Sequence, residues 1–235
     1  MIKKIVEYLK LRWVETSNER YVNYLRKHHV KIGNDVFFRN RKTIEIDLTR
    51  PSLIEIGDSV RFLDGFTLLT HDFTTKVFLN LYDEFLPSSG KVVIGNNVYF
   101  ARKCTVLKGV TIGDNCIFGY GSTITKDIPA NSVAVGTPAK VICTLEEYYK
   151  KRCNQSIEEA FIYARSIKER YGRMPVIEDF WEEFPLFVNG NEMDRYPAHF
   201  KHTMQTQLEN ALMNWKKNHK ATFRNFDEFI EHAFK

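Results

Sequence analysis

A large apolar residue recurs at every sixth position in the middle of the chain. The positions of this first series are Ile94, Phe100, Val106, Ile112, Phe118 and Ile124. Four positions after each of them stands a second series, mostly small or aliphatic: Val98, Cys104, Val110, Cys116, Ser122 and Ile128. Gly or Ala often follows the first position, at Gly95, Ala101, Gly113 and Gly119. A six-residue period is neither that of a helix, about 3.6 residues, nor that of a simple alternating strand.

Two inward residues in every six describe a short strand and a corner, repeated along the chain, with glycines where the backbone bends tightly. Three such sides close a triangular coil of about eighteen residues, and successive coils stack at the ~4.8 Å spacing of paired strands. The pattern therefore predicts a left-handed parallel β-helix, so the fold class is mainly β.

The same period begins earlier in the chain and lapses once. Its earlier members are Ile32, Phe38, Ile44, Ile56, Phe62 and Leu68, with Arg50 at the position of the lapse. Because Ile32 and Ile56 are 24 residues apart, the phase of the six-residue repeat survives. Arg50-Pro51 is predicted to form a corner or a small outward loop, since proline cannot donate to a strand ladder.

A long loop insertion interrupts the repeat at about residues 73–92, directly after Thr70-His71-Asp72. A loop of this length is usually either disordered or functional. Its apolar content argues against disorder: Phe73, Val77, Phe78, Leu79, Leu81, Tyr82, Phe85 and Leu86. We expect it to pack on a neighbouring subunit.

The two ends of the chain have helical periodicity instead. We predict a helical segment at residues 1–29, the β-helix domain at 30–142 and a C-terminal α-helical extension at 143–235. Within the extension, an apolar stripe from Ile157 to Tyr171 predicts a helix, with Ser156 as its cap and Gly172 after its end. Further helices are expected near 176–184, 200–217 and 225–234.

Composition narrows the function classes. Of 235 residues, 27% are charged and 43% hydrophobic, and the net charge is +5, which suits an anionic small molecule at least as well as nucleic acid. There is no basic and aromatic stripe for nucleic acid, no membrane span and no signal peptide, so we expect a cytoplasmic protein. The four cysteines lack metal-site spacing, and Cys104 and Cys116 fall on inward positions as small core residues.

The repeat together with the motifs IGDN, GYGSTITKDIP and GTPAKVI resembles the hexapeptide-repeat acyltransferases, closest to the sugar and xenobiotic O-acetyltransferase branch. The resemblance covers roughly residues 30–142 and leaves out the helical tail. It implies a homotrimer that binds acetyl-CoA between adjacent β-helices, with a histidine as general base and no covalent enzyme intermediate. It implies no metal.

His71 is the candidate general base. It is one of seven histidines and the only one in the predicted β-helix. Like the family's histidine, it follows a coil containing IGD and precedes an extended loop. An imidazole with an ordinary pKa near 6.5 can accept a proton near neutrality. The adjacent Asp72 is a weak candidate for orienting this ring or for meeting substrate, and a backbone carbonyl is the alternative.

The resemblance also implies a set of cofactor-binding residues. Backbone amides around Ala101-Arg102 and Gly119-Tyr120 would hold the pantetheine arm of coenzyme A, and an amide near Ala101 would supply the oxyanion donor. Lys126 and Lys140 match positions that meet the nucleotide phosphates, where an ammonium serves as a compact point charge.

The acceptor is the least determined part of the prediction. Galactoside and maltose enzymes have acidic residues just before the IGD coil, where this chain has Arg50-Pro51-Ser52. Asp64 is a weak candidate for a sugar hydroxyl, although a corner aspartate is the commoner explanation. The first hypothesis is O- or N-acetylation of a sugar or nucleotide-sugar for a surface polysaccharide, such as a capsule or the O-antigen of lipopolysaccharide.

Two alternatives stay open. One is a streptogramin-type antibiotic O-acetyltransferase, and the other is a non-catalytic scaffold built on the same repeat. A β-helical carbonic anhydrase is set aside, because its zinc site requires three histidines and the predicted β-helix contains one.

Overall fold

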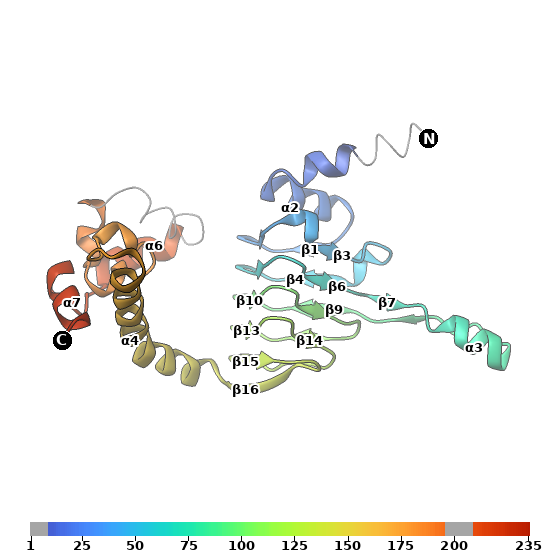
Figure 1. The fold of residues 1–235 in the computed structure, drawn as a ribbon. Coiled ribbons are helices and arrows are strands. Elements are labelled where there is room, and N and C mark those ends of the chain that lie inside the picture. Colours follow the sequence, from blue (N-terminus) through green and yellow to red (C-terminus); the bar gives the residue numbers. More distant parts are fainter. Residues whose placement is uncertain (1–8, 196–208) are drawn as a thin grey trace. The chain divides into compact units, whose positions relative to one another are not determined.

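The computed structural model describes residues 9–195 and 209–235. The chain divides into two compact units, one ending at Tyr149 and one beginning at Lys150. The first unit is a left-handed parallel β-helix, and the second is helical (Figure 1). Residues 1–8 of the predicted N-terminal helix lie outside the described residues.

Three sheets form the sides of the β-helix, which we call faces A, B and C. Face A contains β1 (Lys31–Ile32), β4 (Ile54–Ile56), β9 (Val92–Ile94) and β12 (Thr111–Ile112). Face B contains β2 (Phe37–Phe38), β5 (Arg61–Phe62), β10 (Val98–Phe100), β13 (Cys116–Phe118), β15 (Ser132–Val135) and β16 (Lys140–Thr144). Face C contains β3 (Glu45–Ile46), β6 (Thr67–Leu68), β11 (Thr105–Val106) and β14 (Thr123–Ile124).

The chain visits faces A, B and C in turn, so consecutive coils begin at β1, β4, β9 and β12 and are called coils 1 to 4. All strand pairs between these coils are parallel. In the regular part, Tyr99 pairs with Ile117 and Thr105 with Thr123, a step of eighteen residues. This confirms the coil length predicted from three six-residue sides.

The six-residue series fills the interior, as predicted. Both series between Ile94 and Ile128 are buried, with every member 6% exposed or less. Phenylalanines on successive strands of face B stack nearly parallel: Phe38 on Phe62, Phe62 on Phe100 and Phe100 on Phe118. Cys104 and Cys116 are buried, and burial raises the pKa of Cys104 to about 11, so both are confirmed as core residues rather than nucleophiles.

Coil 1 departs from the predicted phase. The 24 residues between Ile32 and Ile56 form three sides with extra residues, not four regular hexads. Since Glu45 pairs with Thr67, it is Ile46, not Ile44, that matches the inward Leu68. The extra residues form two 3₁₀ turns, Arg41–Thr43 and Pro51–Leu53. The second of these confirms the outward turn predicted at Arg50-Pro51.

The edge strand of face B is covered by a helix before the β-helix. The helix α2 (Asn18–Lys27) buries Tyr21, Val22 and Leu25 against the first coil. The Asn18 side chain donates to the carbonyl of Val36 at 2.8 Å and accepts from the amide of Phe38 at 2.8 Å. These bonds satisfy backbone groups that an open sheet edge would leave unpaired. At the other end, β16 pairs antiparallel with β15 and ends the stack.

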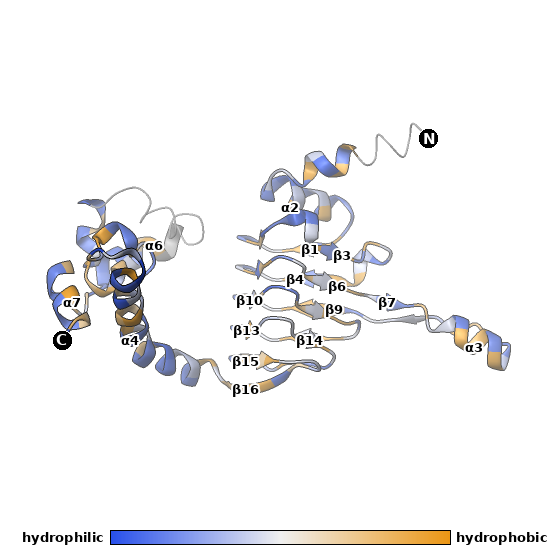
Figure 2. Cartoon of the chain, viewed as in Figure 1, coloured by the Kyte–Doolittle hydropathy of each residue, from blue (hydrophilic) through white to orange (hydrophobic). Residues whose placement is uncertain are grey.

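The predicted insertion is an ordered arm, residues 71–89, that projects from coil 2 (Figure 1). It contains β7 (His71–Asp72), the helix α3 (Thr75–Tyr82) and β8 (Ser88–Ser89), with β7 and β8 antiparallel. The hydropathy colouring shows apolar residues along α3 (Figure 2), and no residue of this helix is buried. Among the residues that the structure describes, nothing buries the arm's apolar side chains, and the expected packing on a neighbouring subunit stays a prediction.

The helical unit has its own core of phenylalanines. The helix α4 (Leu145–Tyr171) begins twelve residues before the predicted start at Ile157, and Ser156 lies in its middle, so the predicted cap is wrong. The N-terminus is instead a capping box, in which Thr144 Oγ1 accepts from the Glu147 amide at 3.2 Å and Glu147 accepts from the Thr144 amide at 2.8 Å. Gly172, with φ of +64°, ends the helix as predicted.

Beyond Gly172 the described elements are short. The helix predicted at 176–184 is replaced by the 3₁₀ turns Ile177–Asp179 and Phe184–Leu186, because Pro175 and Pro185 bracket too few residues for a stable helix. Another 3₁₀ segment, Gly190–Arg195, and the helices α6 (Glu209–Asn218) and α7 (Phe226–Ala233) follow. The first part of the predicted helix 200–217 lies outside the described residues.

Candidate active site

His71 lies where the arm leaves the β-helix, at the corner between faces C and A. Its imidazole Nδ1 is 2.5 Å from Oδ2 of Asp47, a residue of coil 1. Oγ1 of Thr49 lies 3.0 Å from the same nitrogen. The side chain of His71 is 12% exposed and that of Asp47 is 5% exposed. The contact therefore joins two successive coils and is largely shielded from solvent.

Asp47 is held as an ionised carboxylate. Burial raises the cost of its charge, but hydrogen bonds from Thr49 and Thr70 outweigh this effect and hold the pKa of the carboxyl well below its usual range. The donors are the Thr49 amide at 3.0 Å, Thr49 Oγ1 at 2.6 Å, the Thr70 amide at 2.9 Å and Thr70 Oγ1 at 2.5 Å. An ionised carboxylate has no proton to donate, so the proton in its contact with His71 is on Nδ1. In the neutral imidazole, the other ring nitrogen, Nε2, then carries no proton and can accept one.

The orienting contact is made by Asp47 and not by Asp72, the adjacent residue considered from the sequence. Asp72 faces the other way, as strand alternation requires, and its Oδ2 is 2.6 Å from Nζ of Lys108. Hydrogen bonds from Lys108 and Thr74 hold the pKa of Asp72 well below its usual range. The ion pair between Asp72 and Lys108 links the base of the arm to coil 3.

Asp47 was not identified from the sequence, because coil 1 departs from the regular six-residue repeat. Its residue number places it 24 before His71, the same interval that separates Lys31 from its partner Glu55. That interval between an acidic residue and the candidate base was the available signal. The chain therefore does have an acidic residue before the IGD coil, three positions ahead of Arg50.

Asp64 and the candidate pantetheine-binding residues 101–102 and 119–120 lie at a second corner, between faces B and C. Asp64 of coil 2 lies 3.4 Å from Nε of Arg102 and 3.6 Å from Nε of Arg39. Tyr120 follows in coil 4, and this residue is 65% exposed. Within one chain, Asp64, Arg102 and Tyr120 are thus separated from His71 by the width of face C. A role for Asp64 or Asp72 in binding substrate stays a prediction.

The same corner offers backbone donors that fit a pantetheine arm. The amides of Ala101 and Gly119 are not among them, because they donate to the carbonyls of Phe118 and Ala134 in the ladder between coils, each at 3.0 Å. In the described part of the chain, the amides one residue further on, at Arg102 and Tyr120, donate to no protein group. Unpaired amides on successive coils suit the amide carbonyls of pantetheine, so the residues present fit coenzyme A.

The two candidate phosphate-binding lysines are both exposed. Lys126 follows β14 at the corner between faces C and A, the corner that carries His71 in coil 2. Lys140 is the first residue of β16. Their ammonium groups are accessible to an anion, and their role in binding one stays a prediction.

Comparison with known proteins gives the family. The family model described as "Bacterial transferase hexapeptide (six repeats)" matches residues 91–126. Protein CapG of Staphylococcus aureus is 33% identical over 175 residues, which cover 70% of this chain and 97% of CapG. The chain belongs to the hexapeptide-repeat transferases. Galactoside O-acetyltransferase of Escherichia coli K12 is 34% identical over 143 residues, covering 59% of this chain and 66% of that protein.

Solved structures of hexapeptide-repeat transferases match as well. The structure titled galactoside acetyltransferase in complex with coenzyme A has 27% sequence identity and a TM-score of 0.44, covering 63% of this chain and 83% of that one. Among the described residues of our hexapeptide-repeat transferase, no cluster of three or more His, Cys, Asp and Glu side chains could hold a metal ion. No helix within those residues has the length and apolarity needed to cross a membrane.

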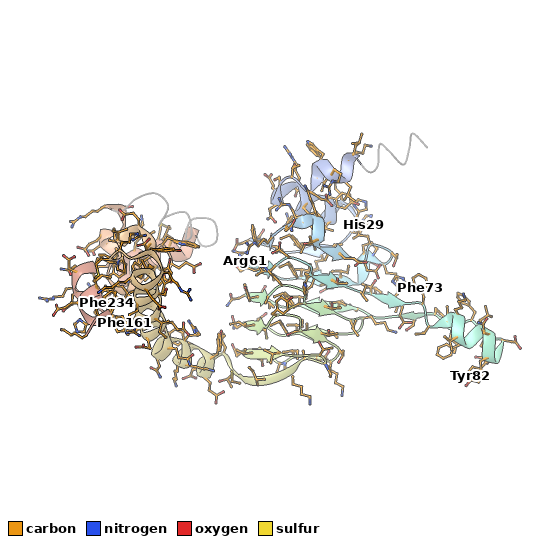
Figure 3. The ribbon with its side chains drawn as sticks, in the orientation of Figure 1. His29, Arg61, Phe73, Tyr82, Phe161 and Phe234 are labelled. Carbon is orange, nitrogen blue, oxygen red and sulfur yellow. The ribbon has the colours of Figure 1, made fainter. Side chains whose placement is uncertain are left out.

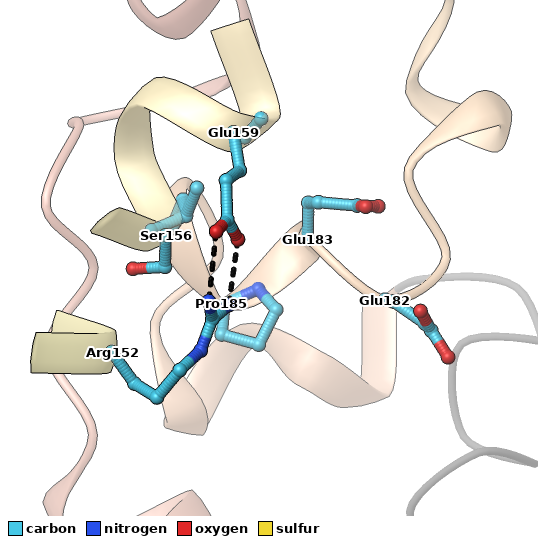
Figure 4. Close-up of a pocket in the computed structure, with 8 residues that line it drawn as sticks. Arg152, Ser156, Glu159, Glu182, Glu183 and Pro185 are labelled. Carbon is cyan, nitrogen blue, oxygen red and sulfur yellow. Dashed lines mark hydrogen bonds and ion pairs between the residues drawn. The ribbon is translucent and has the colours of Figure 1, made fainter. Parts of the chain in front are cut away.

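The helical unit of this hexapeptide-repeat transferase has a cavity of its own, of about 410 Å³ (Figure 4). Its polar lining comes from Arg152, Ser156, Glu159, Glu182 and Glu183. The Arg152 guanidinium makes two hydrogen bonds to the Glu159 carboxylate, at 2.8 and 2.6 Å. Burial raises the pKa of Glu183. The residues that line this cavity all belong to the helical unit, and His71 belongs to the β-helix unit.

The Asp47→Asn substitution should remove part of the acid sensitivity of this hexapeptide-repeat transferase. The folded-state pKa of Asp47 lies below the ordinary unfolded value of about 3.9. The stabilisation from this group is therefore complete above the unfolded pKa and is lost as pH falls through the folded pKa. Urea unfolding of both proteins, from neutral pH to about pH 2, should show their difference in free energy of unfolding shrinking with acidity. A difference that stays constant over this range would contradict the assignment.

Proposed function

We propose that this chain is an acetyl-CoA-dependent acetyltransferase that acts on a hydroxyl or amine of a sugar or nucleotide-sugar. The observation that carries the proposal is the His71 imidazole, whose Nδ1 is bound to ionised Asp47 and whose Nε2 is a proton acceptor. The similarity to a galactoside O-acetyltransferase supports acetyl as the group transferred and a sugar as the acceptor. The resemblance to capsule and lipopolysaccharide enzymes supports a role in cytoplasmic steps of surface polysaccharide synthesis.

In the proposed reaction, His71 acts as general base. Nε2 takes the proton of the acceptor hydroxyl or amine while the acceptor atom bonds to the acyl carbon. The positive charge that forms on the imidazole is stabilised by the Asp47 carboxylate 2.5 Å from Nδ1. Acetyl-CoA, when bound, supplies an acyl group on a thioester whose C–S bond breaks. His71 then returns its proton to the departing sulfur, so the enzyme ends the cycle unchanged.

The threonines around Asp47 orient the His71 ring indirectly. Thr49 and Thr70 fix both oxygens of Asp47 through four hydrogen bonds, and Asp47 fixes the imidazole tautomer. A base that is already oriented loses no conformational entropy as the proton moves. The rigid corner of the β-helix is therefore part of the proposed mechanism.

We further propose a homotrimer with three shared sites. His71 and the free amides of Arg102 and Tyr120 lie at different corners of one chain, so a second subunit is required to bring a base next to a pantetheine-binding corner. In this arrangement the Arg102 or Tyr120 amide faces the thioester oxygen as the oxyanion donor. Lys126 and Lys140 bind the phosphates of coenzyme A.

The proposal is tested by measuring release of the coenzyme A thiol from acetyl-CoA. The acceptor panel contains nucleotide-sugars, simple galactosides, amino sugars and a streptogramin. We expect release that depends on a sugar acceptor and saturates with it. Release with the streptogramin alone would favour the antibiotic-modifying alternative. Absence of acetyl-CoA binding by calorimetry would contradict the proposed function and favour a scaffold.

A further inference from the structure

The ribbon at the base of the arm has two different faces. In the antiparallel pair of β7 and β8, His71 is opposite Ser89 and Asp72 is opposite Ser88. Directly opposed residues share a face, and neighbours along a strand alternate between faces. One face therefore carries Asp72 and Ser88, and the other carries His71 and Ser89.

The face with Asp72 is occupied by contacts within the chain. Ser88 Oγ donates to Asp72 Oδ2 at 3.0 Å, and Lys108 of coil 3 bonds to both residues. This face is fixed against the β-helix and serves to hold the ribbon. The opposite face is the one available to a ligand.

Phe73 lies at the start of the arm (Figure 3). Its ring is next to that of His71. Its ring centroid is 4.8 Å from that of the imidazole, with the two planes at 79°. Nevertheless, 79% of Phe73 is exposed, more than any other large apolar residue described in the chain. Packing within the chain does not explain this position, because the only ring that Phe73 meets among the described residues is the candidate base. A large exposed apolar ring beside a polar site is an informative feature.

We infer that Phe73 is the acceptor platform of the active site and that its occupant is a pyranose ring. The apolar C–H face of the sugar packs on the phenyl ring, which leaves the sugar's rim hydroxyls directed sideways. One of these hydroxyls meets Nε2 of His71, and a neighbouring hydroxyl bonds to the exposed Ser89 hydroxyl. Few polar groups next to an apolar wall are the usual composition of a small-molecule site.

The inference rests on the proposed function, because it takes His71 as the base. It adds a specificity-determining residue that the enzyme's chemistry does not itself require. An acyclic polyol also has a hydroxyl for His71, but it has no rigid C–H face for Phe73. The platform therefore selects a cyclic sugar over a flexible alcohol.

The test compares Phe73→Ala with Phe85→Ala, a matched change of another exposed phenylalanine in the same arm. The probes are methyl β-galactopyranoside, a nucleotide-linked N-acetylhexosamine and glycerol, each with acetyl-CoA. Phe73→Ala should raise the KM for the best pyranose about fivefold to tenfold. The KM for acetyl-CoA should not change, Phe73→Trp should restore the acceptor KM, and Phe85→Ala should keep the acceptor KM of the wild type.

A binding measurement separates this inference from the proposed reaction. Saturation-transfer NMR should show contact with the sugar C–H protons in wild type and in His71→Ala, and a loss of that contact in Phe73→Ala. An unchanged acceptor KM in Phe73→Ala, or an equal rise in Phe85→Ala, would overturn the platform while leaving the acetyltransferase intact. If the wild type transfers acetyl to none of the acceptors and binds no sugar, the proposed function fails and the platform fails with it.

Discussion

Replacing His71 with alanine is expected to lower acceptor-dependent release of coenzyme A thiol by roughly 10²- to 10⁴-fold, the usual contribution of a general base. The variant loses the one side chain in the described β-helix that has an imidazole nitrogen free to take the acceptor's proton. The affinity for acetyl-CoA should stay the same, because the proposed pantetheine donors are the backbone amides of Arg102 and Tyr120, which the substitution leaves in place. Steady-state turnover and calorimetric binding of acetyl-CoA measure the two effects separately.

His28→Ala is the matched control for this substitution. His28 lies in an exposed position directly after α2, with its Nδ1 2.8 Å from the carbonyl of Tyr24. Its loss should leave turnover unchanged. Wild-type turnover in His71→Ala would remove the base from the mechanism, and an equal fall of turnover and cofactor affinity would point to a distorted cleft instead.

The repeat could be read from the sequence because its physical cause is local. Each inward residue is fixed by the corner next to it, so an unbroken series such as Ile94 to Ile124 gives both the fold and the coil length. Coil 1 shows the limit of this reading. Its two 3₁₀ turns lengthen two of the three sides, but the number of residues in the coil is still a multiple of six. The residue count therefore gave no sign that the inward positions had shifted.

The active-site prediction was incomplete for the same reason. His71 was identified by its place before the insertion, but its partner Asp47 is 24 residues away in another coil, and its contact depends on the stacking register. Asp72 was considered as the residue that orients His71 because it is adjacent in sequence, but strand alternation directs its side chain toward Lys108. Likewise the carbonyls of the next coil decide which corner amides are free, and they engage Ala101 and Gly119. Such choices are properties of paired strands and not of motifs.

The stacked coils also hold the site together. His71 belongs to coil 2, Asp47 to coil 1 and Lys108 to coil 3, so the geometry of the base depends on the spacing of three coils. The interior phenylalanines fill the space inside these coils, since Phe38, Phe62, Phe100 and Phe118 stack with ring centroids 4.6 to 5.2 Å apart. Damage to this stack should therefore affect both stability and turnover.

Phe100→Ala is expected to lower the free energy of unfolding by about 3 to 5 kcal/mol. Phe100 is fully buried and contacts three other rings, those of Phe62, Phe66 and Phe118. Alanine would leave a cavity that the surrounding strands cannot fill, because each strand is fixed in its ladder by the coils on either side. Urea denaturation at a fixed protein concentration measures the loss.

Two further variants make the Phe100 result specific. Phe100→Leu keeps much of the apolar volume, so it should cost clearly less than Phe100→Ala. Tyr99→Ala removes an aromatic ring from the same strand, but this ring faces outward and is 40% exposed, so its cost should also be smaller. If Tyr99→Ala were as damaging as Phe100→Ala, an outer surface of face B would matter as much as the interior stack. If Phe100→Ala cost less than about 1 kcal/mol, the coils would have to close around the missing ring, and the stack would not be a main source of stability.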